Sequence, residues 1–153
     1  MSIALHADRF TPLPPAAAAA WEGFPGREGR FFPHVVGLVL EEVRRDYARM
    51  RLPYRPELNQ PAGVVHGGAI ATLVDTAVVP AIASGYPERR PFFTVNMLVQ
   101  YLEPVVSEDA IAEAWVEKRG RSTVFCRVEI RTPSGKFAAT GALVYKVSSR
   151  ALG

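Results

Sequence analysis

GAIATLVDTAVVPAIAS, residues 68–84, is the stretch that decides the fold, because it is apolar on nearly every side. A helix without a polar face is enclosed by protein rather than laid on a solvated surface. Asp75 is the only formally charged residue between Glu57 and Glu88, and Pro80 is expected to kink the helix. The sequence therefore predicts one buried helix over residues 68–84.

Strand-like runs surround this helix in the sequence. Four follow it, separated by turn signals and centred on residues 94–101, 110–117, 123–131 and 137–147. In the third run, charged residues alternate with Cys126, Val128 and Ile130, as expected of an antiparallel sheet with one wet and one dry face. Residues 35–52 are expected to form two more strands before a proline-rich loop at 53–66. The predicted fold class is α+β, with one central helix against a largely antiparallel sheet of about six strands.

Bulk properties narrow the class of protein. A length of 153 residues with 48% hydrophobic residues suits one domain with its own core. We expect a surface extension with short helical turns over residues 1–34, the folded domain over 35–148 and a tail at 149–153.

A net charge of +3 is too mild for a nucleic-acid-binding protein. Cys126 is alone, which offers no disulfide framework or zinc site and suits a reducing compartment, so we expect a cytoplasmic protein. No apolar stretch reaches the roughly 18 to 20 uninterrupted residues of a membrane-spanning helix.

Two local features suggest chemistry. A carboxylate such as Asp75 in an apolar helix is costly, so it needs either a structural bond or a chemical purpose. The segment Val64-Val65-His66-Gly67-Gly68 directly precedes the helix. Its two glycines allow a bend and close approach by a ligand, and the first N–H groups of a helix can receive a developing oxyanion. A structural carboxylate and a tight turn are the alternatives, and both stay open at this point.

The spacing of these two features suggests a site shared by two chains. Asp75 lies eight residues after Gly67, roughly 12 Å along a helix axis, which is too far for both to touch one carbonyl group. Two antiparallel copies of the helix around a two-fold axis would place Asp75 of one chain near Gly67 of the other. We therefore hypothesise two equivalent sites per dimer.

The segment Gln60-Pro-Ala-Gly-Val-Val-His-Gly-Gly-Ala-Ile-Ala-Thr-Leu-Val-Asp75 resembles the signature of the PaaI-like, phenylacetyl-CoA thioesterase family of hotdog-fold proteins. The match includes the His-Gly-Gly triplet and the Asp nine residues after the His. The segments Tyr101-Leu-Glu-Pro104 and Lys118-Arg-Gly-Arg-Ser122 also resemble family elements, and the resemblance covers about residues 32–147. It implies a hotdog fold, a homodimer or homotetramer, and hydrolysis of aryl- or medium-chain acyl-CoA without a cofactor or metal.

The resemblance also implies roles for four residues. The backbone N–H of Gly67 takes the oxyanion-hole role. Asp75 either attacks the thioester carbon or activates the attacking water. Gln60, six residues before the His, helps to orient water or the thioester. His66 supports this end of the site, either through a backbone bond that holds the turn or through proton transfer.

Further residues are candidates for substrate contacts. For the acyl group and the thioester we expect Gly68, Val79, Phe93 and Met97, although apolar residues at such spacings also form ordinary core. For the phosphates of CoA we expect the basic turn of Arg119, Gly120, Arg121 and Ser122, although such a turn can equally be a solvated tip. Pro80 stands where the resemblance leads us to expect Gly or Ala, which leaves the size of the acyl group open.

The same fold leaves other functions open. A non-catalytic acyl-CoA-binding sensor is the main alternative, but such regulators carry a DNA-binding appendage, and residues 1–34 are too short and irregular for a helix-turn-helix. A hydratase or dehydratase needs a His and a carboxylate in an arrangement that this sequence lacks. Cys126 has no base paired to it in the sequence, so we expect a buried small hydrophobe rather than a nucleophile.

Overall fold

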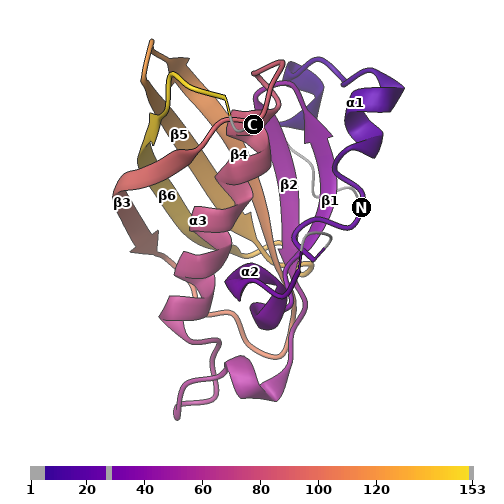
Figure 1. Ribbon diagram of the computed structural model, residues 1–153. Coiled ribbons are helices and arrows are strands. Elements are labelled where there is room, and N and C mark those ends of the chain that lie inside the picture. Colours follow the sequence, from indigo (N-terminus) through magenta and orange to yellow (C-terminus); the bar gives the residue numbers. More distant parts are fainter. Residues whose placement is uncertain (1–5, 27–28, 152–153) are drawn as a thin grey trace.

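The computed structural model describes residues 6–26 and 29–151, and within them one long helix packs against one face of a six-stranded antiparallel sheet (Figure 1). The helix is α3 (Gly67–Ala83). The strands are β1 (Val39–Arg44), β2 (Tyr47–Leu52), β3 (Phe92–Tyr101), β4 (Ala110–Arg119), β5 (Thr123–Arg131) and β6 (Phe137–Val147), in the spatial order β1-β2-β4-β5-β6-β3. This architecture confirms the predicted α+β fold with a central helix.

The core lies between α3 and the sheet. Leu73, Val74 and Ala77 of α3 are completely buried. The sheet meets them with small residues: a Cβ atom added at Gly141 of β6 would lie 2.5 Å from Val74, so glycine is what allows the helix to approach this closely. The helix therefore sits deep in the curved sheet, which fixes the position of every residue along it.

Helix α3 begins at Gly67, one residue before the predicted start, and continues through Pro80 to Ala83. Pro80 has no N–H to donate to the carbonyl of Thr76 one turn earlier, but the ends of the helix are unaffected. The kink expected at this proline stays a prediction. No helix in the described part of the chain is long and apolar enough to cross a membrane.

The start of the first predicted strand is wrong. Residue 35 belongs to a short helix, α2 (Phe32–Val36), and β1 begins only at Val39. Proline stands in the first turn of α2, and Gly37 ends it in a left-handed conformation with φ of 88°. The N–H of Gly37 donates back to the carbonyl of His34, which closes the last turn. The following hairpin of β1 and β2 and the loop at 53–66, which holds the short turn η2 (Pro56–Leu58), agree with the prediction.

The N-terminal segment contains the short helical turns η1 (Ala7–Arg9) and α1 (Pro15–Ala19), followed by α2. The part of it around residues 10–12 lies against the outer face of the sheet, where the ring of Phe10 stacks on Tyr47 at 5.2 Å and Pro12 forms a bridge with Arg44 of β1. Residues 1–5 and 27–28 of the predicted extension, and 152–153 of the predicted tail, lie outside the described residues.

Candidate active site

His66 caps the start of α3. Its Nδ1 atom accepts the backbone N–H of Gly68 at 2.8 Å. Because Nδ1 accepts this bond, the neutral imidazole carries its proton on Nε2. Of the two roles expected for His66, the structure shows the backbone bond that holds the turn, and proton transfer stays a prediction.

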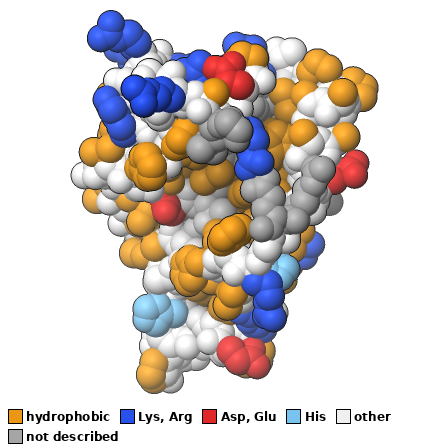
Figure 2. Space-filling view, viewed as in Figure 1, with side chains coloured by type: hydrophobic (Ala, Val, Ile, Leu, Met, Phe, Trp, Pro, Cys, Tyr) orange, Lys and Arg blue, Asp and Glu red, His pale blue; other side chains and the backbone are white. Residues whose placement is uncertain are grey.

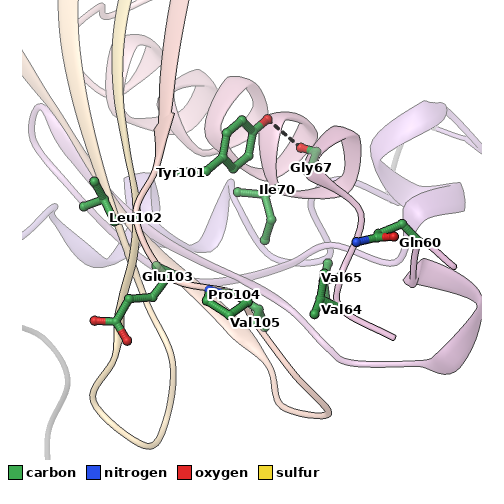
Figure 3. Close-up of a pocket in the computed structure, with 11 residues that line it drawn as sticks. Gln60, Val64, Val65, Gly67, Ile70, Tyr101, Leu102, Glu103, Pro104 and Val105 are labelled. Atoms are coloured by element: carbon green, nitrogen blue, oxygen red, sulfur yellow. Dashed lines mark hydrogen bonds between the residues drawn. The ribbon is translucent and has the colours of Figure 1, made fainter. Parts of the chain in front are cut away.

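Gly67 offers a free donor at the first position of the helix. No described residue accepts its N–H, whereas its carbonyl oxygen accepts the hydroxyl of Tyr101 at 2.8 Å (Figure 3). A Cβ atom at Gly67 would lie 3.3 Å from the Tyr101 ring, and one at Gly68 would lie 3.0 Å from Nδ1 of His66. Neither glycine has a positive φ. Both glycines therefore allow close approach by neighbouring side chains, and the bend and the approach by a ligand expected from the sequence stay predictions.

A cavity of about 360 Å³ opens beside Gly67. Its lining consists of Gln60, Val64, Val65, Gly67, Ile70, Tyr101, Leu102, Glu103, Pro104, Val105 and Ala138. The side-chain oxygen of Gln60 accepts the N–H of Ala62 at 2.8 Å, and its amide nitrogen points toward the other lining residues (Figure 3). The structure thus brings two predicted site residues, Gln60 and Gly67, to one cavity.

Asp75 is half-buried and held by two hydroxyl groups. Its Oδ1 atom accepts the hydroxyl of Thr94 on β3 at 2.9 Å and that of Tyr145 on β6 at 2.5 Å. No described residue donates to Oδ2. Burial, and next the bond to Asp75, raise the pKa of Tyr145, so the phenol stays protonated and can donate. The carboxylate is neither paired with a cation nor saturated with hydrogen bonds in the described chain.

The two halves of the candidate site stay apart within one chain. Asp75 does not line the cavity beside Gly67, and eight helical residues separate them by roughly 12 Å along the axis. Tyr101 contacts Gly67 and Thr94 contacts Asp75, so β3 runs antiparallel alongside α3 and touches both halves.

The two β3 residues expected to contact the acyl group lie on opposite faces of the sheet. Met97 is paired with Leu143 on the helix-facing side, whereas Phe93 is paired with Lys146 on the outer side. The register shift between Thr94 and Asn96 causes this difference. Phe93 therefore does not face Asp75 of its own chain. Val79 lies half-buried on α3.

Arg119, expected to contact phosphate, caps the C-terminal end of α3 instead. Its Nη2 atom donates to Oδ1 of Asp46 and, at 3.0 Å, to the carbonyl of Ile82, and the guanidinium stacks 4.5 Å from the ring centre of Tyr86. A side chain at Gly85 would overlap this guanidinium. These contacts occupy Nη2 of Arg119, and its phosphate role stays a prediction.

The rest of the basic turn is accessible. The N–H of Gly120 donates to the carbonyl of Thr123 at 2.8 Å and closes the turn, and Arg121 is exposed. Lys146 donates from Nζ to the hydroxyl of Ser122 at 3.0 Å. Sequence reasoning missed this lysine because it lies 24 residues further along the chain, and only the pairing of β5 with β6 brings it here.

The part of the chain that the structure describes shows no cluster of metal ligands and no ionised thiol. No group of three or more His, Cys, Asp or Glu side chains is placed to hold a metal ion among residues 6–26 and 29–151. Burial raises the pKa of Cys126 to about 12, so the thiol is uncharged near neutral pH, in keeping with a buried hydrophobe.

Thr94 and Tyr145 contact the candidate site residue Asp75, and sequence reasoning did not find them. The available signal was indirect: Asp75 required a partner, and Tyr145 places a polar group on the dry face of β6, where Leu143 and Val147 also point. Alternation alone assigns this face to core, so it does not single out a tyrosine whose hydroxyl reaches the helix.

Comparisons with known proteins give a consistent result. A family model described as the thioesterase superfamily matches residues 62–139, which include His66, Gly67 and Asp75 but not Tyr145. Human acyl-coenzyme A thioesterase 13 is 35% identical over 118 residues, covering 74% of this chain and 83% of the human protein.

Solved structures share the fold. A conserved protein of Pseudomonas aeruginosa superposes with a TM-score of 0.74 at 27% identity, covering 81% of this chain and 100% of that one. The E. coli PaaI protein from the phenylacetic acid degradation operon superposes with a TM-score of 0.73 at 18% identity, covering 79% and 86%. The predicted hotdog architecture is confirmed.

Proposed function

The chain belongs to the thioesterase superfamily, and from this membership we propose that it hydrolyses acyl-CoA thioesters to a free acid and CoA. One observation carries the proposal: a free N–H at Gly67 and a carboxylate with a free oxygen at Asp75 lie on the same helix. In the reaction the carbon–sulfur bond breaks and water supplies the new oxygen of the acid. The proton from water goes to the departing thiolate of CoA.

The roles of the site residues follow from what each atom can do. The N–H of Gly67 stabilises the negative charge on the thioester oxygen in the tetrahedral state. Asp75 removes a proton from water or attacks the acyl carbon directly. The amide nitrogen of Gln60 is free to donate to water or the thioester from the cavity wall. His66 holds the turn that presents the N–H of Gly67.

We place the complete site between two chains, because neither half is complete alone. β3 is an edge strand, and its outer edge is unpaired within the described sheet. If β3 pairs antiparallel with the β3 of a second chain, a two-fold axis near the middle of the strand brings the end of one strand that holds Thr94 beside the end of the other that holds Tyr101. Thr94 accompanies Asp75 and Tyr101 accompanies Gly67, so this axis brings Asp75 of each chain toward Gly67 of its partner.

The exposure of β3 supports this pairing. Phe93, Val95 and Leu98 are 65%, 64% and 58% exposed, which is unusual for large apolar side chains on one strand. Hydrophobic side chains gather on the left of the molecule, over β3 and α3 (Figure 2). An unprotected apolar edge strand is prone to pair with another chain. We propose a homodimer on this edge, and the homotetramer expected from the family resemblance would be a further association of such dimers.

Substrate contacts are proposed from the same geometry. The apolar walls of the cavity beside Gly67, formed in part by Val64, Val65 and Ile70, suit an acyl chain of aryl or medium length. Arg121 and Ser122, with Lys146, suit the phosphates of CoA. Arg119 is less suited because Asp46 already binds it.

A free-thiol assay over a panel of acyl-CoA substrates tests the function. Asp75→Asn keeps the shape and polarity of the side chain but removes its basicity, so we expect kcat to fall by roughly 10²- to 10⁴-fold with the fold intact. Asp109→Asn is the matched control, because Asp109 also accepts two hydrogen bonds, from Arg51 and from the N–H of Tyr54, but lies outside the proposed site. It should lower stability and leave kcat unchanged.

Near-normal thioester hydrolysis by Asp75→Asn would refute the catalytic role of Asp75. If the wild-type chain is stabilised by an acyl-CoA but releases no thiol from any member of the panel, the chain is a binding module rather than an enzyme.

A further inference from the structure

Tyr145 makes the shortest hydrogen bond to the proposed catalytic carboxylate of Asp75. The sequence alone assigns no role to this tyrosine. Its hydroxyl lies 2.5 Å from Oδ1 of Asp75 and 3.0 Å from the backbone carbonyl of the same residue. The phenol has a single proton, and the shorter distance assigns that proton to the carboxylate. The tyrosine is only 3% exposed, and its ring packs edge-on against Phe92.

From this geometry we infer that Tyr145 is a positioning residue: its hydroxyl, together with that of Thr94, fixes Oδ1 of Asp75 so that Oδ2 faces the reacting water or thioester. The inference rests on the proposed thioesterase function and adds to it which carboxylate oxygen acts. Two hydroxyl donors from two different strands meet on one oxygen, which prevents the carboxylate from rotating and exchanging its oxygens.

Tyr145 suits this task because its proton stays in place. Burial first, and then the bond to Asp75, raise its pKa above the ordinary value for tyrosine, so it remains a donor across the pH range of catalysis. The ionisable groups that act on it among the described residues are Asp75 on α3 and Cys126 on β5. Burial raises the pKa of Cys126 to about 12, so this thiol is uncharged, and β3 carries no charged side chain.

Tyr145→Phe, which keeps the ring and removes only the hydroxyl, tests the inference. We expect kcat to fall by about 10- to 100-fold, as for loss of a hydrogen bond to a charged group, while KM changes by less than about twofold.

Tyr47→Phe is the matched control. Tyr47 is also buried and also donates to a carboxylate, Oε1 of Glu113 at 2.7 Å, but on the outer face of the sheet. It should lose stability like Tyr145→Phe and keep the wild-type kcat. If Tyr145→Phe has the kcat of the wild type, or if Tyr47→Phe shows the same fall in kcat, the inference is overturned.

Two measurements separate this inference from the proposed function. The ¹³C NMR signal of the Asp75 carboxyl group, assigned with Asp75→Asn, needs no turnover: its chemical shift should change in Tyr145→Phe, and an unchanged chemical shift overturns the inference. In the wild-type chain, the Tyr145 hydroxyl proton should exchange slowly with water and shift in Asp75→Ala. The absence of that shift overturns the inference even if Tyr145→Phe does not fold. Absence of thiol release by the wild type would instead refute the proposed function.

Discussion

The backbone N–H of Gly67 can be removed by substitution with proline, and no side chain is lost because the residue is glycine. It stands at the first position of α3, where proline is well tolerated. His66 before it has φ of −59° and ψ of 135°, which is the conformation that a residue before proline prefers. Gly67→Pro should therefore keep the helix and abolish the oxyanion donor. We expect kcat to fall by roughly 10²- to 10³-fold with an unchanged far-UV circular dichroism spectrum.

The control for this prediction is Gly67→Ala, which adds the same Cβ atom but keeps the N–H. That atom would lie 3.3 Å from the ring of Tyr101, which is more than half exposed and can shift by a few tenths of an ångström. Gly67→Ala should thus lose much less activity than Gly67→Pro. Equal losses in the two variants would mean that crowding of Tyr101, and not the N–H, is what matters.

At the residue scale, the sequence predicted the groups that lie on one continuous segment. The spacing from Gln60 to Asp75 is local, and the cavity confirms that Gln60 and Gly67 lie together. Thr94 and Tyr145 approach Asp75 only because two strands distant in the sequence cross the same helix. A contact of that kind depends on the register of the strands, which alternation does not fix to one residue.

Arg119 shows that a basic side chain can bind the end of a helix rather than a ligand. The carbonyl groups at the C-terminal end of a helix attract cations, and Arg119 reaches the carbonyl of Ile82 while Asp46 balances its charge. We expect Arg119→Met to lower the free energy of unfolding by about 2 kcal/mol, since it leaves Asp46 and the helix end without a partner. Chemical denaturation measures this loss.

The comparison variant for Arg119 is Arg121→Met, two residues away on the exposed turn. It should leave stability within about 0.5 kcal/mol, as for an ordinary surface substitution, and raise KM for acyl-CoA. A raised KM in Arg119→Met at full stability would reverse the assignment and make Arg119 the phosphate contact.

The elements were predicted where one physical signal dominated. An apolar run without a polar face gave α3 to within one residue, and alternation gave β4 to β6. The short helix α2 was missed because Val36, Leu38 and Leu40 alternate like a strand. Its local signals were proline in its first turn and Gly37 at its end, and over five residues those signals outweigh alternation.

At the scale of the whole molecule, the central question is whether one chain or two complete the site. The described chain has the N–H of Gly67, the proposed oxyanion donor, beside a cavity and Asp75 elsewhere on the same helix. The antiparallel course of β3 along α3 means that a two-fold axis through the middle of β3 exchanges these two places. Size-exclusion chromatography with light scattering should accordingly give a dimer or a multiple of it.

Mixing two inactive variants decides whether the site is shared. In a heterodimer of Asp75→Asn with Gly67→Pro, one site combines both defects, while the other pairs the intact Asp75 of one chain with the intact Gly67 of the other. Random exchange of equal amounts makes half of the dimers heterodimers with one good site of two, so roughly a quarter of wild-type activity should return. If each chain held its own complete site, every site in the mixture would keep one defect, and activity would stay at the level of the two variants measured apart. Refolding the mixture from denaturant ensures the exchange, and the unmixed variants refolded in the same way provide the baseline.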